Sequence, residues 1–434
     1  MGHKDDGISV EALVNEINVS DNPCVLFYKP QDTSSQSHPL LRSEDFVLII
    51  MNNAQCEILK KYGSDCICID GTHGTNGYRF ELITLLVLDD MRQGFPCAFL
   101  ISNRSDQDVL SLFFSEIKTK VEKVRPQVFM SDLGESFYNA WLSQMEEPVR
   151  RLYCSWHTDR AWRKTICIKI KSKERQVETY KLVRSLMQER DVITFEHVFP
   201  LALERVVSDP VTAEFGFYLQ EHYAKSTRCW TYCYRANSDI NTNMHIERMH
   251  RTIKYIYLRG KHVKRLDKSI HALMSFVRDK LHDRLIILTK GKLTSKLKDI
   301  RSKHDLSSEV VQERIVEEGK GWLVPSSTSD VGVTYFVQPN VQGCSCKLIC
   351  IDCQGCIDSC VDSSIRWNMC KHIHFVCLYK TRQSSISVNV SNFRDVNDDE
   401  DILHIYEEGE SVVSEKESIL VELSRRNIES SDLT

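Results

Sequence analysis

The amino-acid sequence predicts an α/β fold followed by a small metal-binding module. Three apolar runs with strand character, one helical segment and a fourth short apolar run follow one another between residues 66 and 130, as expected of an α/β core. Hydrophobic residues make up 42% of the 434 residues and charged residues 27%, so the composition is that of a globular protein. Eight of the 17 cysteines lie between Cys344 and Cys377, and this clustering indicates a metal site.

The predicted core begins with a helix over residues 43–63. Its apolar stripe at helical spacing is Phe46, Ile49, Ile50, Ala54 and Ile58. Strands are expected next over 66–69, 80–88 and 95–101, then a helix over 106–124 and a strand over 127–130. The turn-rich residues 71–77 separate the first two strands.

The second half of the chain is predicted to be mainly helical. Helices are expected from 136 to about 221, with 152–154 as a candidate fifth strand. The segment 243–258 is predicted to be a helix whose buried stripe is Ile246, Met249, Ile253 and Ile256. Basic helix is then expected to continue to about residue 319, followed by a linker over 325–330 and a strand over 333–337.

Charge is distributed unevenly along the chain, although the formal net charge is only −4. Residues 244–304 contain 17 Lys and Arg against 5 Asp and Glu, and residues 150–184 contain 11 against 3. Residues 393–434 reverse the balance, with 4 against 13. Two basic stretches together favour a polyanion-binding body, whereas either stretch alone is more typical of a solvated helix face. The acidic end is expected to be a flexible interaction segment or a pair of short helices.

The sequence contains neither the pattern of a membrane span nor that of a signal peptide. The longest runs, 46–51 and 82–88, are far shorter than the roughly 18 residues of a membrane span. The first 17 residues lack an apolar core and mix acids with bases, which is not the pattern of a signal peptide. No membrane association is therefore expected, and a metal site explains the cysteines better than a disulfide framework.

Two aspartates stand at the ends of predicted strands. Asp70 follows the run 66–69 and Asp132 follows the run 127–130. Carboxylates at the ends of adjacent strands can converge at one sheet edge, and Glu247 on the helix 243–258 can complete the set. Three such carboxylates can hold two divalent ions for phosphoryl transfer, and Mg²⁺ suits them. Taken singly, each aspartate is more typical of a turn or cap, and the glutamate of a solvated charge.

Several motifs resemble, in order, those of Mutator-like element (MULE) transposases. They are Asp70-Gly-Thr-His-Gly-Thr-Asn76, Ser131-Asp132 with Phe137-Tyr-Asn-Ala-Trp141, Cys154-Ser-Trp-His157 with Ala161-Trp-Arg-Lys164, and Asn243-x3-Glu247-x2-His250-x3-Lys254. The resemblance implies a ribonuclease-H-like fold with a helical insertion between the second and third acids. It also implies a DDE-type DNA transposase, in which Asp70, Asp132 and Glu247 hold catalytic Mg²⁺ or Mn²⁺.

Basic residues beside these motifs are candidate DNA contacts. They are Arg160, Arg163, Lys164, Arg251 and Lys254. The pair Cys154-x2-His157 also occurs in the family, and here it is interpreted as structural or as lying close to DNA. A protease dyad is disfavoured, because residues so close in sequence rarely present a nucleophile and its base correctly.

The cysteine cluster resembles a SWIM zinc finger. Cys344-Ser-Cys346, then 23 residues, then Cys370-Lys-His372 supplies three thiols and one imidazole, a closed ligand set for structural Zn²⁺. The alternative is a set of reduced core cysteines. Four further cysteines, Cys350, Cys353, Cys356 and Cys360, are candidates for a second zinc or are loop residues. His374 and Cys377 are expected to lie in the core.

These features predict five segments: an N-terminal segment 1–42, a transposase-like domain 43–300 with its insertion at about 158–240, a helix and linker 301–330, a SWIM zinc finger 331–380, and an acidic tail 381–434. The predicted function is DNA strand cleavage and transfer in the nucleus. The alternative is an inactive, co-opted SWIM zinc-finger factor that binds DNA or protein. Full-length relatives usually carry an N-terminal DNA-binding domain, so the possibility that this sequence is a fragment stays open. The possibility of a homo-oligomer stays open as well.

Overall fold

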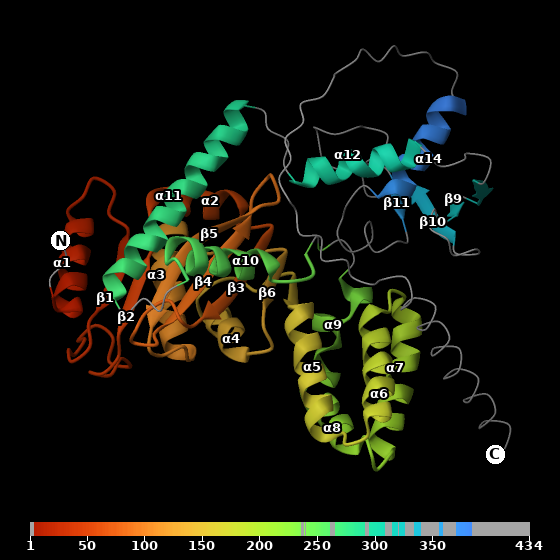
Figure 1. Cartoon of the computed structure of the whole chain (residues 1–434), viewed down its shortest axis with the longest axis horizontal. Coiled ribbons are helices and arrows are strands. Elements are labelled where there is room, and N and C mark those ends of the chain that lie inside the picture. The colour runs from red at the N-terminus through yellow and green to blue at the C-terminus, as the bar shows by residue number, and fades with distance from the viewer. Residues whose placement is uncertain are drawn as a thin grey trace. The chain divides into compact units, whose positions relative to one another are not determined.

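The computed structural model describes residues 4–383 except 236–237, 239, 261–264, 291–294, 309–314, 320, 326–333, 340–355 and 359–369. The chain divides into two compact units, each of which is described by itself (Figure 1). Unit 1 comprises the described residues of Met1–Ala161, Arg228–Trp230 and Asn241–Lys296. Unit 2 comprises those of Trp162–Thr227, Thr231–Ile240 and Leu297–Thr434.

Unit 1 is built on a mixed seven-stranded sheet with the order β1-β2-β5-β4-β3-β6-β7. The strands are β1 Val25–Lys29, β2 Val47–Ile50, β3 Cys66–Thr72, β4 Glu81–Leu88, β5 Gly94–Ser102, β6 Val128–Ser131 and β7 Arg150–Tyr153. The first five in this order pair antiparallel, while β3, β6 and β7 are parallel. This mixed sheet, followed by helices, is consistent with a ribonuclease-H-like core. The strands expected over 66–69, 80–88, 95–101 and 127–130 are confirmed.

Helices cover the sheet of unit 1. They are α1 Asp6–Asn18, α2 Asn53–Tyr62, α3 Gln107–Val121, α4 Glu135–Gln144, α10 Met244–Thr252 and α11 Leu266–Lys290. Helix α2 packs on β4 and β5, α3 packs on β1 and β2, and α10 packs on β3 and β5 (Figure 1). Helix α10 therefore brings a segment from late in the chain onto the strand that ends near Asp70.

The helix expected over 43–63 is half wrong. Its first part is strand β2, fully buried between β1 and β5, and only Asn53–Tyr62 is helical. The continuous apolar run Phe46–Met51 fits a strand buried on both faces as well as a helix. The helix begins where Asn52 and Gln55 form a capping box.

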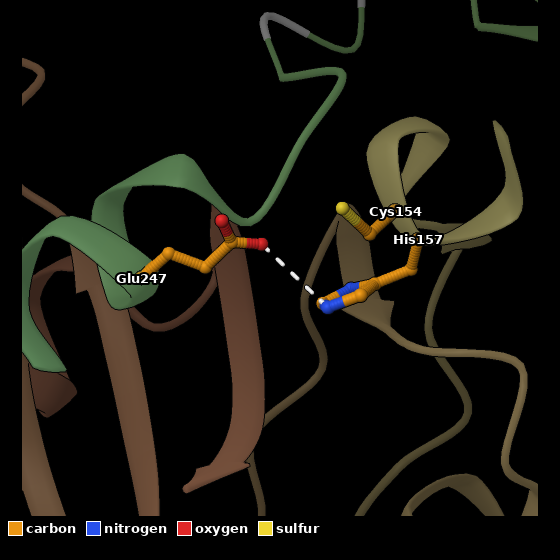
Figure 2. Close-up of side chains that lie close together, drawn as sticks. All are labelled: Cys154, His157 and Glu247. Carbon is orange, nitrogen blue, oxygen red and sulfur yellow. Dashed lines mark ion pairs between the residues drawn. The ribbon is translucent and has the colours of Figure 1, made fainter. Parts of the chain in front are cut away.

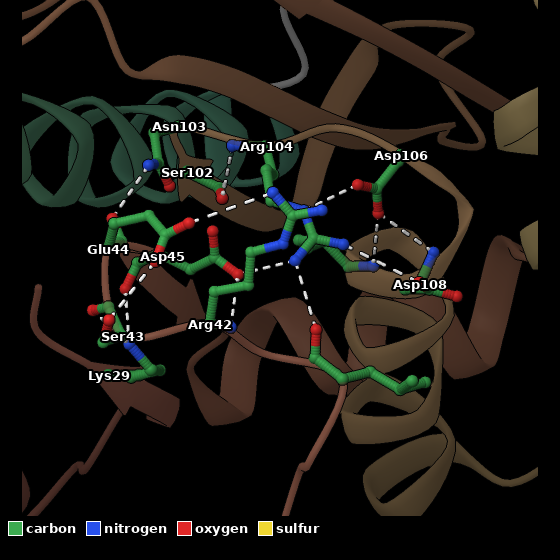
Figure 3. A network of polar contacts seen from close by, with 12 residues as sticks. Lys29, Arg42, Ser43, Glu44, Asp45, Ser102, Asn103, Arg104, Asp106 and Asp108 are labelled. Carbon is green, nitrogen blue, oxygen red and sulfur yellow. Dashed lines mark hydrogen bonds and ion pairs between the residues drawn. The ribbon is translucent and has the colours of Figure 1, made fainter. Parts of the chain in front are cut away.

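A polar network fixes the loop before β2 (Figure 3). The buried carboxylate of Asp45 accepts a hydrogen bond from Arg104 Nη1 at 2.6 Å, and Arg104 also pairs with Asp106, the N-cap of α3. Lys29 Nζ donates to the backbone carbonyls of Ser43 and Asp45. Asp45 lies near the start of the helix expected over 43–63, but in the structure it joins the loop before β2 to Arg104, which also pairs with the N-cap of α3.

The first part of unit 2 is helical, as expected for residues 136 to about 221. Helix α5 Ser155–Lys169 starts in unit 1 and continues into unit 2, where α6 Lys173–Gln188, α7 Val192–Ser208 and α8 Ala213–His222 follow. The short helix α9 Thr227–Trp230 and 3-10 turns at Ala224–Ser226 and Tyr232–Tyr234 complete it. Aromatic residues fill the helical core, where Phe195 stacks on Phe199 and Trp162 lies edge-on to Tyr223.

The later part of unit 2 contains helices α12 Ser295–Ser308 and α14 Lys371–Gln383, and a four-stranded antiparallel sheet with the order β11-β10-β9-β8. The strands are β8 Val316–Glu318, β9 Gly321–Pro325, β10 Thr334–Pro339 and β11 Cys356–Asp358. The strand expected over 333–337 is confirmed, but helix does not continue to 319, since β8 and β9 occupy that region. Within the described part of the chain, none of the helices has the length and hydropathy needed to cross a bilayer.

Candidate functional site

The sheet register brings the two strand-ending aspartates together. Strands β3 and β6 are parallel neighbours with Cys66 opposite Val128 and Cys68 opposite Met130. Continuing this register by two residues places Asp70 opposite Asp132. Asp70 is the fifth residue of β3, and Asp132 directly follows β6. Strands β3 and β6 are therefore adjacent and parallel, as a site built from Asp70 and Asp132 requires.

Electrostatics show that the carboxylates of this cluster repel one another. Burial, and to a lesser extent the charges of Asp132, Glu247 and Glu81, together raise the pKa of Asp70 from 3.8 to about 7. A hydrogen bond from the Gly71 N–H opposes the shift but does not cancel it. Three acids act on one half-buried carboxyl group, so the four carboxyl groups form a site with excess negative charge. Such a site fits a divalent cation, because oxygen ligands without a compensating cation are otherwise costly to bury.

Glu247 reaches this cluster from α10. The helix buries Ile246, Met249 and Ile253, as predicted, and Glu247 lies half-buried beside them. The buried His250 anchors the same helix, since its Nε2 lies 3.0 Å from the hydroxyl of Thr84 on β4. Burial lowers the pKa of His250 to about 3, so it contributes a neutral hydrogen bond rather than a charge.

The helix changes its winding immediately after α10. Residues Ile253–Tyr257 form a π-helical turn, a feature often found at functional sites. The predicted stripe is wrong at Ile256, which is 68% exposed, because the wider turn rotates this residue off the buried face. Lys254, in contrast, points toward the sheet and donates from Nζ to the Thr72 hydroxyl at 2.6 Å.

His157 pairs with the third acid, Glu247, and Cys154 lies close to both residues (Figure 2). His157 Nε2 lies 3.6 Å from Glu247 Oε1, and the ligand atoms of Cys154, His157 and Glu247 all lie within 4.8 Å of one another. Burial lowers the pKa of His157, which favours the neutral imidazole. The sequence placed this pair in a structural or DNA-adjacent role, and its contact with Glu247 was not foreseen.

Glu81 is a further residue that the sequence analysis missed. It is the first residue of β4 and lies across from the end of β3. A Cβ atom on Gly71 would overlap the Glu81 carboxylate, so the glycine makes room for this acid beside Asp70. An acid at the start of a long apolar strand was the signal available in the sequence.

The five basic candidates occupy different environments. Arg160 is exposed near Trp156, with its guanidinium 5.2 Å from the ring centroid, and its charge lowers the pKa of Glu247 against the effect of burial. Arg163, Lys164 and Arg251 are exposed on α5 and α10. Lys254 is half-buried and bonded to Thr72. Arg160, Arg251 and Lys254 all belong to unit 1, as do the acids.

Only half of the predicted zinc ligands fall within the described residues. Cys370 and His372 are buried at the start of α14, with Cys370 Sγ 3.8 Å from His372 Nδ1. Cys370 packs with Val324, Val337 and Phe375. Cys344 and Cys346 lie outside the described residues, as do Cys350, Cys353 and Cys360, and of Cys356 only the strand backbone is described. His374 is buried and Cys377 packs against the same core, as expected.

The fold and the acidic cluster define a class of protein: an α/β chain with a mixed sheet whose parallel strands carry carboxylates at adjoining ends. Residues 66–160 of this chain match the family model for the MULE transposase domain. The matched range contains Asp70, Asp132, Cys154 and His157. No curated protein matches the chain.

Proposed function

We propose that this chain is a DDE-type transposase that cleaves and transfers DNA strands in a metal-dependent reaction. The observation that carries the proposal is the parallel pairing of β3 with β6, which brings Asp70 and Asp132 to one sheet edge, where the charge of Glu247 on α10 also acts on Asp70. The MULE transposase domain at residues 66–160 supports the same chemistry. Three carboxylates from β3, the end of β6 and α10 are a ligand set for hard divalent ions.

In this proposal Asp70, Asp132 and Glu247 hold Mg²⁺ or Mn²⁺. Bound there, such ions activate the attacking oxygen and stabilise the leaving oxygen of phosphoryl transfer. The chain's own residues fix the ligands: His250 anchors the helix of Glu247 to β4, and Lys254 joins the same segment to Thr72 at the end of β3. These contacts hold Glu247 and Asp70 in one region and reduce the reorganisation required when a cation binds.

DNA is the proposed substrate, and the nucleus the proposed location. The exposed Arg160 and Arg251 lie on the helices that carry His157 and Glu247, where cationic side chains can neutralise phosphates beside the carboxylates. We also propose that Cys344, Cys346, Cys370 and His372 hold a structural zinc. The proximity of Cys370 Sγ and His372 Nδ1 supports this role.

A nicking assay on supercoiled DNA with Mg²⁺ or Mn²⁺ tests the catalytic proposal. The protein should nick DNA, and the Asp132→Asn variant should be slower by at least about 100-fold, because a metal ligand is lost. Asp108→Asn is the matched control, since Asp108 is an exposed acid in the first turn of α3, and this variant should stay active. Equal activity of the protein and Asp132→Asn would contradict the assignment.

Absence of nicking in the protein itself would favour a different function. The alternative is a binding factor that retains the fold and the basic surface without cleaving DNA. A gel-shift assay then tests this alternative, because a binding factor should retard duplex DNA with or without Mg²⁺, whereas a protein that neither nicks nor retards DNA supports neither function.

A further inference from the structure

Cys154, His157 and Glu247 form a compact side-chain cluster that the proposed reaction does not fully use (Figure 2). Cys154 is completely buried directly before α5, and its sulfur accepts a hydrogen bond from the Asn243 N–H at 3.2 Å. Burial raises the pKa of the Cys154 thiol, and hydrogen bonds from backbone N–H groups, including that of Asn243, oppose this shift. Ser155 donates both its N–H and its hydroxyl to the Asn241 carbonyl, which fixes α5 to the chain that leads into α10.

We propose that these three residues form a zinc site, here called the Cys-His-Glu site, and that zinc bound there withdraws Glu247 from the catalytic acids. The existence of the site stands on its own geometry. Its inhibitory effect rests on the proposed function, because only a catalytic Glu247 makes its capture inhibitory.

The distances suit tetrahedral zinc. Zinc bonds of about 2.0–2.1 Å to nitrogen and about 2.0–2.2 Å to oxygen place two such ligand atoms about 3.4 Å apart. His157 Nε2 and Glu247 Oε1 are 3.6 Å apart. With a Zn–S bond of about 2.3 Å, a sulfur would lie about 3.5 Å from the nitrogen, within the 4.8 Å limit of the cluster. Ligand-atom movements of at most about 1.3 Å, from 4.8 Å to about 3.5 Å, complete the geometry.

The chemistry of the ligands selects zinc over magnesium. A thiolate and an imidazole are softer ligands than Mg²⁺ accepts, whereas zinc binds cysteine, histidine and glutamate together. Three protein ligands leave a fourth position for water, as in open zinc sites. Zinc binding displaces the Cys154 proton to solvent, so the site becomes Cys⁻, neutral His and Glu⁻ around one cation.

Polar atoms at and beside the ligands are poorly satisfied. Glu247 Oε1, a ligand atom, and His157 Nδ1, the second ring nitrogen of a ligand, are both buried without a hydrogen-bond partner among the described residues. Asn243, whose N–H contacts Cys154, is likewise completely buried, with both side-chain polar atoms lacking such a partner in the described part of the chain. Buried polar groups normally find partners, so unsatisfied atoms around three ligands point to an absent one.

Zinc content of the full chain tests the site without any activity measurement. The purified protein, equilibrated with excess Zn²⁺ and desalted, is analysed by elemental mass spectrometry. Cys154→Ser should carry one zinc fewer per chain than the protein, and Cys167→Ser, an exposed cysteine on the same helix, should carry the same number. Equal zinc content in the protein and Cys154→Ser would overturn the proposal. If Cys154→Ser does not fold, as judged by circular dichroism, His157→Ala replaces it with the same expected loss.

Inhibition is measured separately. Micromolar Zn²⁺ should inhibit Mg²⁺-dependent nicking, and the half-inhibitory concentration should rise at least about tenfold in Cys154→Ser. If zinc inhibits Cys154→Ser as strongly as the wild type, the proposal that bound zinc withdraws Glu247 from the catalytic acids is wrong. The measured zinc content would still decide whether the Cys-His-Glu site exists. A protein that never nicks DNA would remove the proposed function but not the zinc site, so the two failures are distinguishable.

Discussion

Replacing Asp70 with asparagine should stabilise the metal-free protein at alkaline pH. The pKa of Asp70 is raised from 3.8 to about 7, first by burial and then by the charges of Asp132, Glu247 and Glu81. A raised pKa means that the folded chain retains a proton that the unfolded chain releases. Wild-type stability is therefore highest below the unfolded pKa and is lost as the pH rises through about 7. Asparagine removes the charge and hence this loss.

The size of the effect follows from the shift. The interval from 3.8 to about 7 is about 3 pKa units, and at about 1.4 kcal/mol per unit the full penalty is at most about 4 kcal/mol. Between pH 5 and pH 8 the penalty grows over about 2 units, or about 3 kcal/mol. The advantage of Asp70→Asn over the wild type should grow by about that amount across this range.

The stability difference between Asp70→Asn and the wild type is measured by urea unfolding with chelator at pH 5 and pH 8. Hydrogen exchange of peptides from β4 and β5 serves as the readout, so that only the unfolding of unit 1 is followed. Asp267→Asn is the matched control, because Asp267 is also buried but its hydrogen bond and ion pair with Arg265 lower its pKa to about 2. This control should be destabilised at pH 8, since it removes the carboxylate that pairs with Arg265 and accepts from Ser9. A wild-type protein that equals Asp70→Asn at both pH values would refute the acidic cluster.

Three further predictions concern other parts of the molecule. Arg284→Ala should lower the free energy of unfolding of unit 1, measured by urea unfolding, by about 3 kcal/mol, because it removes the ion-pair partner of the buried Asp89. The control Arg278→Ala, which changes an exposed residue of the same helix, should cost less than about 0.5 kcal/mol. Chelation of zinc should speed hydrogen exchange in α14 and leave β3–β5 protected, and uniform protection would contradict a structural zinc at its start. DNA affinity should fall steeply with salt, and Arg163→Ala with Lys164→Ala should reduce the log–log slope by up to about 2, whereas an unchanged slope would exclude both residues from the interface.

The sequence predicted the elements that local pattern determines. Strands β3–β6 and the helix of Glu247 follow from long apolar runs and a helical stripe, so the order of the acids could be read before their positions were known. Strand β2 was assigned to a helix, because a run that is buried on both faces carries no periodicity. Ile256 was misplaced by the π-helical turn, which a regular helical pattern does not reveal.

The contacts among distant segments could not be predicted. Cys154 and His157 approach Glu247 only because Ser155 is tied to Asn241 and His250 to Thr84, and these long-range hydrogen bonds leave no local signature. Glu81 joins the cluster for a similar reason, since its position beside Gly71 depends on the pairing of β3 with β4.

Diffraction from crystals soaked in Mn²⁺, recorded near the manganese absorption edge, tests the central claim most directly. An anomalous peak within bonding distance of carboxylate oxygens of both Asp70 and Asp132, absent from Asp132→Asn crystals, is the predicted result. Crystals that show manganese at other carboxylates and none at this pair would contradict the shared metal site and the strand cleavage attributed to it.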